Sequence, residues 1–134
     1  MTCVWDSLIA AVRTLRLDPE FHNIRHARDF VVRLQSRNGH TINTKVNGHF
    51  LRPQELIENY EAVQRYKPES VHDGYLCSSS DPFLALFSEV YNVDVIHTLN
   101  GFDTVYNQSS PTGEVNLRSS STHMRFISAR NFSC

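Results

Sequence analysis

The stretch from residue 81 to residue 106 constrains the fold most, because two kinds of periodicity meet within it. Asp81-Pro82 is typical of a helix start, since aspartate caps free amides and proline is tolerated in the first turn. The following residues, FLALFSEVY, are apolar on nearly every side, which predicts a buried helix. From residue 93 apolar and polar residues alternate, and Asn100-Gly101 predicts a tight turn between two strands.

Three further helices are predicted upstream of this stretch. The first is expected from about Cys3 to Arg16 with Thr2 as its cap, because apolar residues recur at helical spacing. The second is expected from Asp18-Pro19 to about residue 37, with Arg33 and Arg37 on its solvated face, and the third from Pro53 to about residue 66. Residues 40–52 predict a short hairpin or irregular loop, and residues 67–80 a long loop.

Strands are predicted downstream, at about residues 93–98, 102–106, 114–118 and 123–129. Because helices come first and strands last, we expect an α+β fold with N-terminal helices packed on a C-terminal antiparallel sheet. The length of 134 residues predicts a single domain spanning residues 1–134.

Composition narrows the classes of function. The formal net charge is −1 and there is no basic run, which does not favour a nucleic-acid or membrane partner. The three cysteines, Cys3, Cys77 and Cys134, are odd in number and form no CxxC pair, so we expect neither a disulfide framework nor a cysteine-rich zinc site. The sequence predicts no metal and no cofactor, and a reducing, cytoplasmic compartment.

Cys3 is the candidate nucleophile, because it opens a predicted amphipathic helix. Helix N-termini present unpaired N–H groups and a partial positive charge, and both favour the reactive thiolate over the thiol. The competing interpretation is a small buried hydrophobic residue. His123, which opens the last predicted strand, is the candidate base, since imidazole titrates near neutral pH.

Two segments resemble one protease family. The run LALFSEVYNVDVI at residues 84–96 resembles the helix-to-strand segment of ovarian tumour (OTU) family cysteine proteases, and CVWDS at residues 3–7 resembles their nucleophile motif. A strand, a short polar turn and then a histidine, here His123, also follow the family's order. The resemblance implies an OTU-like, papain-like fold and a cysteine protease or deubiquitinase. It implies action on ubiquitin, a ubiquitin-like protein or a viral polyprotein, in the host cytoplasm if the protein is viral.

The resemblance also implies roles for individual residues. Cys3 would attack the scissile carbonyl, and His123 would take the thiol proton and return it to the leaving amine. The substrate tail is expected between the first helix and the last strand, beside the serine-rich segments 78–80 and 119–122. Trp5, Ser120, Ser121 and Thr122 are the candidate substrate-binding residues, although the helical spacing of Trp5 favours the core. Asn116 and Asn131 are candidates to orient the histidine.

Two departures from the family pattern support an alternative. The family carries Asp-Gly-x-x before the cysteine, where this sequence has Met1-Thr2, and an aspartate or asparagine two residues after the histidine, where it has Arg125. The alternative is a catalytically inactive OTU-like module that binds ubiquitin or another protein. A metal- or nucleotide-binding α+β protein is a third interpretation, although the sequence has no Gly-rich phosphate loop.

Overall fold

The computed structural model describes residues 2–20, 26–120 and 123–132. Its elements in chain order are α1 (Cys3–Leu15), α2 (Ala27–Ser36), β1 (Lys45–Val46), β2 (His49–Phe50), α3 (Pro53–Arg65), the short 3₁₀ helix η2 (Pro68–Asp73), α4 (Pro82–Tyr91), β3 (Val93–Leu99), β4 (Phe102–Asn107), β5 (Gly113–Ser119) and β6 (Met124–Asn131). The predicted mixed α+β class, with helices leading into a sheet, is therefore confirmed.

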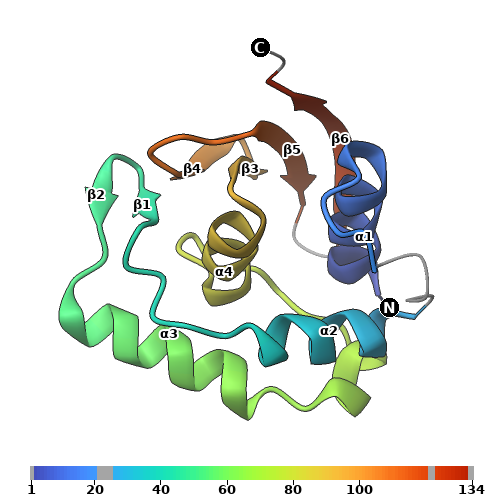
Figure 1. Ribbon diagram of the computed structural model, residues 1–134. Helices are drawn as coiled ribbons and strands as arrows, with labels where there is room; N and C mark the ends of the chain where they lie inside the picture. Colours follow the sequence, from blue (N-terminus) through green and yellow to red (C-terminus); the bar gives the residue numbers. More distant parts are fainter. Residues whose placement is uncertain (1, 21–25, 121–122, 133–134) are drawn as a thin grey trace.

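Helices and sheet form separate layers (Figure 1). The six-stranded sheet has the order β2-β1-β4-β3-β5-β6 and lies along the top of the view. Helix α4 lies beneath the sheet, and α2 and α3 lie beneath α4. Helix α1 packs against β6, so the first and last elements of the described chain lie side by side.

The sheet is mixed, so the prediction of an antiparallel sheet is wrong at one position. Strands β3 and β5 are parallel, with a register that runs from Val93 opposite Gly113 to Leu99 opposite Ser119, whereas the other neighbouring pairs are antiparallel. The cause is the Asn100-Gly101 hairpin, which places β4 on one edge of β3. The chain then crosses to the other edge, where β5 runs in the same direction as β3.

The residues at 45–50 form a hairpin that extends the sheet. Asn47 and Gly48 have φ angles of 50° and 85°, the left-handed values that a tight hairpin turn requires. Strand β1 then pairs with β4. Of the two structures predicted for residues 40–52, the hairpin is the one that forms.

Helix α4 confirms the prediction made from Asp81-Pro82. The Asp81 carboxylate accepts hydrogen bonds from the backbone N–H groups of Phe83 and Leu84, which would otherwise lack partners. Asn92 ends the helix with a left-handed φ of 52°. Seven of its ten residues are buried, because the sheet covers one side of α4 and helices α2 and α3 lie on the other.

Two predictions about the first two helices are wrong. Asp18-Pro19 does not begin α2, which starts at Ala27; Asp18 instead forms a buried ion pair with Arg33 and lies near Arg37, so these arginines do not form a purely solvated face. The Thr2 hydroxyl does not cap α1, because it donates to the Asp6 carboxylate at 2.7 Å. Part of the expected helix, residues 21–25, lies outside the described residues.

Candidate active site

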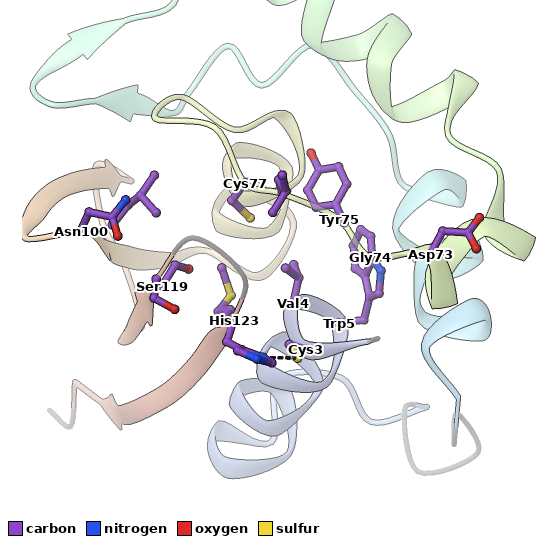
Figure 2. Close-up of a pocket in the computed structure, with 14 residues that line it drawn as sticks. Cys3, Val4, Trp5, Asp73, Gly74, Tyr75, Cys77, Asn100, Ser119 and His123 are labelled. Atoms are coloured by element: carbon purple, nitrogen blue, oxygen red, sulfur yellow. Dashed lines mark hydrogen bonds between the residues drawn. The ribbon is translucent and has the colours of Figure 1, made fainter.

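The two candidate catalytic residues, 120 positions apart in sequence, meet in the structure. The Cys3 sulfur lies 3.5 Å from Nδ1 of His123, within hydrogen-bonding distance for sulfur. Cys3 is half-buried at the start of α1, and His123 is exposed immediately before β6. Figure 2 shows the imidazole pointing at the sulfur across the end of the helix. The structure therefore brings a thiol and a base into direct contact.

Backbone contacts hold the two elements in this arrangement. The N–H of Ser120 donates to the carbonyl of His123 at 2.8 Å, which closes the turn between β5 and β6. The Ser7 hydroxyl donates to the Cys3 carbonyl at 2.7 Å and also lies 3.4 Å from the Met124 carbonyl. Ser7 thus links the first turn of α1 to the start of β6. The sequence alone indicated no role for Ser7, because its partner is 117 residues away.

The first turn of α1 presents free amide groups beside the sulfur. The first bond of the helix runs from Asp6 N–H to the Thr2 carbonyl at 2.9 Å. The N–H groups of Cys3, Val4 and Trp5 precede that bond and have no partner within the helix. Groups of this kind can stabilise negative charge that develops next to them.

A cavity of about 560 Å³ opens from the Cys3–His123 pair (Figure 2). One wall is the segment 73–77, the other is formed by the β3–β4 turn and the end of β5, and α1 forms the floor of the cavity. The lining residues are Cys3, Val4, Trp5, Asp73, Gly74, Tyr75, Leu76, Cys77, Leu99, Asn100, Ser119, Ser120, His123 and Met124. The segment 73–77 therefore takes the place that we expected for serines 78–80.

The candidate substrate-binding residues divide into three groups. Ser120 lines the cavity, as expected. Trp5 also lines it but is fully buried against Tyr66, Tyr75 and Phe83, which confirms the core interpretation. Ser121 and Thr122 lie outside the described residues.

The wall at 73–77 is held by the buried carboxylate of Asp81. It accepts hydrogen bonds from the Tyr75 hydroxyl at 2.8 Å and from the Ser78 N–H at 3.2 Å, in addition to capping α4. Burial raises the pKa of Asp81, although these hydrogen bonds oppose the shift. Burial, together with the nearby Asp81, also raises the pKa of Cys77, so Cys77 is held as a neutral thiol. That Cys77 shares a cavity with Cys3 could not be predicted from its position in a polar loop.

The opposite wall contains a buried histidine. His97 in β3 is fully buried, and its Nε2 lies 2.7 Å from the Ser119 hydroxyl. Burial lowers the pKa of His97, which keeps the ring neutral. The Asn100 N–H donates to the Ser119 carbonyl at 3.2 Å, so Ser119 is fixed both through its side chain and through its backbone.

Neither candidate orienting residue lies beside His123. Asn131 pairs with Gly113 at the far end of β6, about 23 Å along the strand from its start at Met124. Asn116 pairs with Ser128, about 13 Å from the start of β6. Arg125 is exposed and pairs with Arg118. Both asparagines are therefore too far away to hydrogen-bond the imidazole, because strand pairing carries them along the sheet.

The described part of the chain offers no other reactive centre of the kinds considered. Among the described residues, no group of three or more His, Cys, Asp or Glu side chains is arranged to hold a metal ion. Within the same residues, no helix has the length and apolar character needed to cross a bilayer. Cys3 and Cys77 are free thiols, and Cys134 lies outside the described residues.

Comparison with known proteins adds no assignment to this geometry. The chain matches no family model, no curated protein and no solved structure. The functional argument therefore rests on the site itself.

Proposed function

We propose that the protein is an OTU-like cysteine protease that cleaves isopeptide or peptide bonds after the C-terminal tail of ubiquitin or a ubiquitin-like protein. The observation that carries the proposal is the 3.5 Å contact between the Cys3 sulfur and His123 Nδ1 at the edge of a cavity. A nucleophile and a base within hydrogen-bonding reach are the minimum that thiol-based acyl transfer needs.

The reaction proceeds in two halves. His123 accepts the thiol proton, the sulfur forms a bond to the scissile carbonyl carbon, and the carbonyl oxygen becomes negatively charged. When the C–N bond breaks, His123 returns the proton to the leaving amine, and an acyl thioester remains on Cys3. A water molecule then gives a proton to His123 and attacks the thioester, and the carboxylic acid and the thiol are released. The free amides of the first turn of α1 are the proposed donors to the oxyanion.

The cavity suits an extended tail that ends in glycines. Gly74 has a φ of 88° and space where a side chain would stand, so the wall at this point is backbone alone. The floor of the cavity is the packed aromatic core around Trp5. Leu76 and Phe102 are 77% and 79% exposed beside the walls, and they are the proposed contacts for the folded body of the substrate.

A ubiquitin probe with a C-terminal electrophile tests this proposal directly. We expect the parent protein to gain the mass of one ubiquitin, and Cys3→Ala to gain none. His123→Ala should slow the reaction by about 10²- to 10⁴-fold, the usual effect of losing a general base. Cys77→Ala is the matched control, because it removes the other thiol of the same cavity and should leave labelling intact. Labelling of Cys3→Ala at the parent rate would refute the assignment of the nucleophile.

An inactive binding module is the second candidate, favoured by one observation. No described residue donates to or accepts from the second ring nitrogen of His123 in the hydrogen bonds of the structure, and Arg125 stands where the family pattern has a carboxylate or amide. Such a module would bind ubiquitin without forming a covalent adduct. Binding by the parent protein with no adduct, under conditions in which a small alkylating agent modifies Cys3, would select this candidate.

The cleavage of a viral polyprotein is tested by the same variants. The parent protein, Cys3→Ala and His123→Ala would each be incubated with the precursor that contains this chain, and fragments would be identified by mass. Cleavage by the parent alone would assign the precursor as a substrate. We propose the cytoplasm, or the host cytoplasm for a viral protein, as the site of action.

A further inference from the structure

His97 is a fully buried histidine that contacts Ser119, a residue that lines the cavity. Its side chain is fully inaccessible, and among the described residues its Nδ1 has no hydrogen-bond partner. Its Nε2 lies 2.7 Å from the hydroxyl oxygen of Ser119, which lines the cavity. One ring nitrogen of this histidine is therefore without a hydrogen-bond partner among the described residues, and the other faces a residue of the candidate site.

This arrangement determines where the single proton of the neutral ring resides. Nδ1 has no partner in either tautomer, but a buried N–H without an acceptor is rarer in proteins than a buried acceptor without a donor. A proton on Nε2 forms a hydrogen bond to the Ser119 oxygen at 2.7 Å. The tautomer with the proton on Nε2 is favoured, and in it Ser119 accepts from the histidine. The serine's own O–H is then free to donate elsewhere.

Because Ser119 lines the cavity, its hydroxyl proton can be donated to an acceptor bound there. Ser119 is almost buried, and the hydrogen bonds among the described residues include no acceptor for its O–H. Figure 2 shows Ser119 between Asn100 and His123 at the edge of the cavity. Among the described residues that line the cavity, Asp73 is the only one with a carboxylate, and none is a lysine or an arginine. A neutral acceptor, such as a peptide carbonyl, matches this lining better than a phosphate or a carboxylate does.

We propose that the Ser119 hydroxyl donates a hydrogen bond to a backbone carbonyl of the extended substrate tail, and that His97 is the positioning residue that directs it. The inference rests on the proposed function and adds to it a binding residue outside the Cys3–His123 pair. Ser119 would hold the tail in register without taking part in the proton transfers. Its effect therefore falls on substrate binding.

The tautomer is measured first, in the free protein and without any substrate. Long-range proton–nitrogen correlation spectra of the histidine rings should show His97 with its proton on Nε2. The His97→Gln variant identifies the signal and keeps an N–H donor near Ser119. A spectrum with the proton on Nδ1 would overturn the inference, because Ser119 would then donate to His97 and could not donate to substrate.

Binding is measured next, with chemistry switched off. In the Cys3→Ala background, calorimetry with ubiquitin should show affinity weakened about 3- to 10-fold by Ser119→Ala, the size of one neutral hydrogen bond. Ser119→Thr retains the hydroxyl and should restore most of the affinity. Ser109→Ala is the matched control, because it removes the hydroxyl of an exposed serine that does not line the cavity and should change affinity less than 2-fold.

The reactivity of Cys3 distinguishes the proposed binding role of Ser119 from a purely structural role. In chains that retain Cys3, the rate of alkylation by iodoacetamide and its pH profile should be the same with and without Ser119→Ala. A changed profile would mean that Ser119 acts by moving His123, and would overturn the inference. Equal ubiquitin affinity of the Ser119→Ala and parent backgrounds, or no ubiquitin binding by either, would also overturn it.

The outcomes also separate this inference from the proposed protease function. If the parent chain forms no adduct with the ubiquitin probe while Ser119→Ala still weakens binding, the protease proposal fails and the inference stands. If the parent chain forms the adduct while Ser119→Ala binds normally, the protease proposal stands and the inference fails.

Discussion

Two aspartates in this chain share a local sequence and a degree of burial but differ in what they do. Asp18-Pro19 and Asp81-Pro82 are the same dipeptide, and the residues are 7% and 1% exposed. Asp81 caps α4 and holds the cavity wall, and its carboxylate accepts hydrogen bonds from four neutral donors that all lie within six residues of it in the sequence. Asp18 begins no helix and instead binds Arg33 and the Tyr91 hydroxyl, joining segments distant in sequence.

The kinds of partner give the two carboxyl groups opposite electrostatics. Burial alone would raise the pKa of Asp18, but hydrogen bonds from Arg33 and Tyr91 and the charges of Arg33 and Arg37 outweigh it and lower the pKa. At Asp81 burial is the larger effect and raises the pKa, because no cation compensates for it. The charged form of the buried carboxyl group is therefore favoured by its partners at Asp18, whereas burial disfavours it at Asp81.

Asp18→Asn should have the largest effect on stability. It leaves the Arg33 guanidinium, which is 16% exposed, without its main counter-charge, and we expect a loss of about 3 kcal/mol in the free energy of unfolding. Urea unfolding measures the change. Glu20→Gln is the matched control, because Glu20 also contacts Arg33 but is 79% exposed, and its effect should stay below about 0.5 kcal/mol. Equal losses in both variants would contradict the assignment of a buried pair.

Asp81→Asn should lower the free energy of unfolding by about 1–2 kcal/mol, which is less than the loss expected for Asp18→Asn. The amide oxygen can still cap α4, but the amide nitrogen replaces an oxygen that accepts from Tyr75 and Ser78. The cavity wall should loosen, so labelling by the ubiquitin probe should slow while iodoacetamide still modifies Cys3 at the parent rate. A stability loss as large as that of Asp18→Asn would remove the contrast between the two sites.

A matched pair of tyrosine changes should sharpen the comparison further. Tyr91→Phe removes a donor to the ionised Asp18 at 3.0 Å and should cost about 1.5 kcal/mol or more. Tyr75→Phe removes a donor to Asp81 at 2.8 Å and should cost about 1 kcal/mol, because its acceptor is less fully charged. Chemical unfolding at pH 7 gives both values. The reverse order would indicate that Asp81, rather than Asp18, carries the fuller charge.

The smallest effect is a difference in the slope of stability against pH. The pKa of Asp18 is lowered from 3.8, so its contribution is present above that value and is lost as the pH falls through the folded pKa. The pKa of Asp81 is raised from 3.8, so its contribution is present below that value and is lost as the pH rises through the folded pKa. Between pH 3 and pH 6, the stability difference between parent and variant should therefore grow with pH for Asp18→Asn and shrink for Asp81→Asn.

Local patterns in the sequence predicted the elements whose partners are local. Helix α4, the β3–β4 hairpin and most of α1 follow from periodicity, capping and Asn-Gly turns, and they lie where they were predicted. Asp18 shows the limit, because its role depends on Arg33 and Tyr91, which no local pattern connects to it. The parallel pairing of β3 with β5 was not predicted for the same reason. Whether the chain crosses over β3 before forming β5 depends on which edge of β3 remains free, and no local pattern indicates that edge.

The residues of the candidate site also fall into those that local sequence patterns predicted and those that they did not. Cys3 and His123 were proposed from a helix start and a strand start, and the structure places them in contact, while their catalytic roles stay a prediction. The segment 73–77, Cys77 and the His97–Ser119 pair were not predicted, because polar loops and single strand residues give no signal of the cavity that they share. Asn116 and Asn131 were chosen by closeness in sequence, which the extended geometry of strands turns into distance.

The pairing of α1 with β6 has a consequence for when the contact between Cys3 and His123 can form during synthesis. Cys3 is synthesised 120 residues before His123, and the Ser7–Met124 contact joins the same two elements. Until β6 has left the ribosome, the nascent chain carries a thiol with no base beside it. The contact between the thiol and the imidazole therefore depends on the synthesis of the last strand of the sheet, although the thiol itself belongs to the first helix.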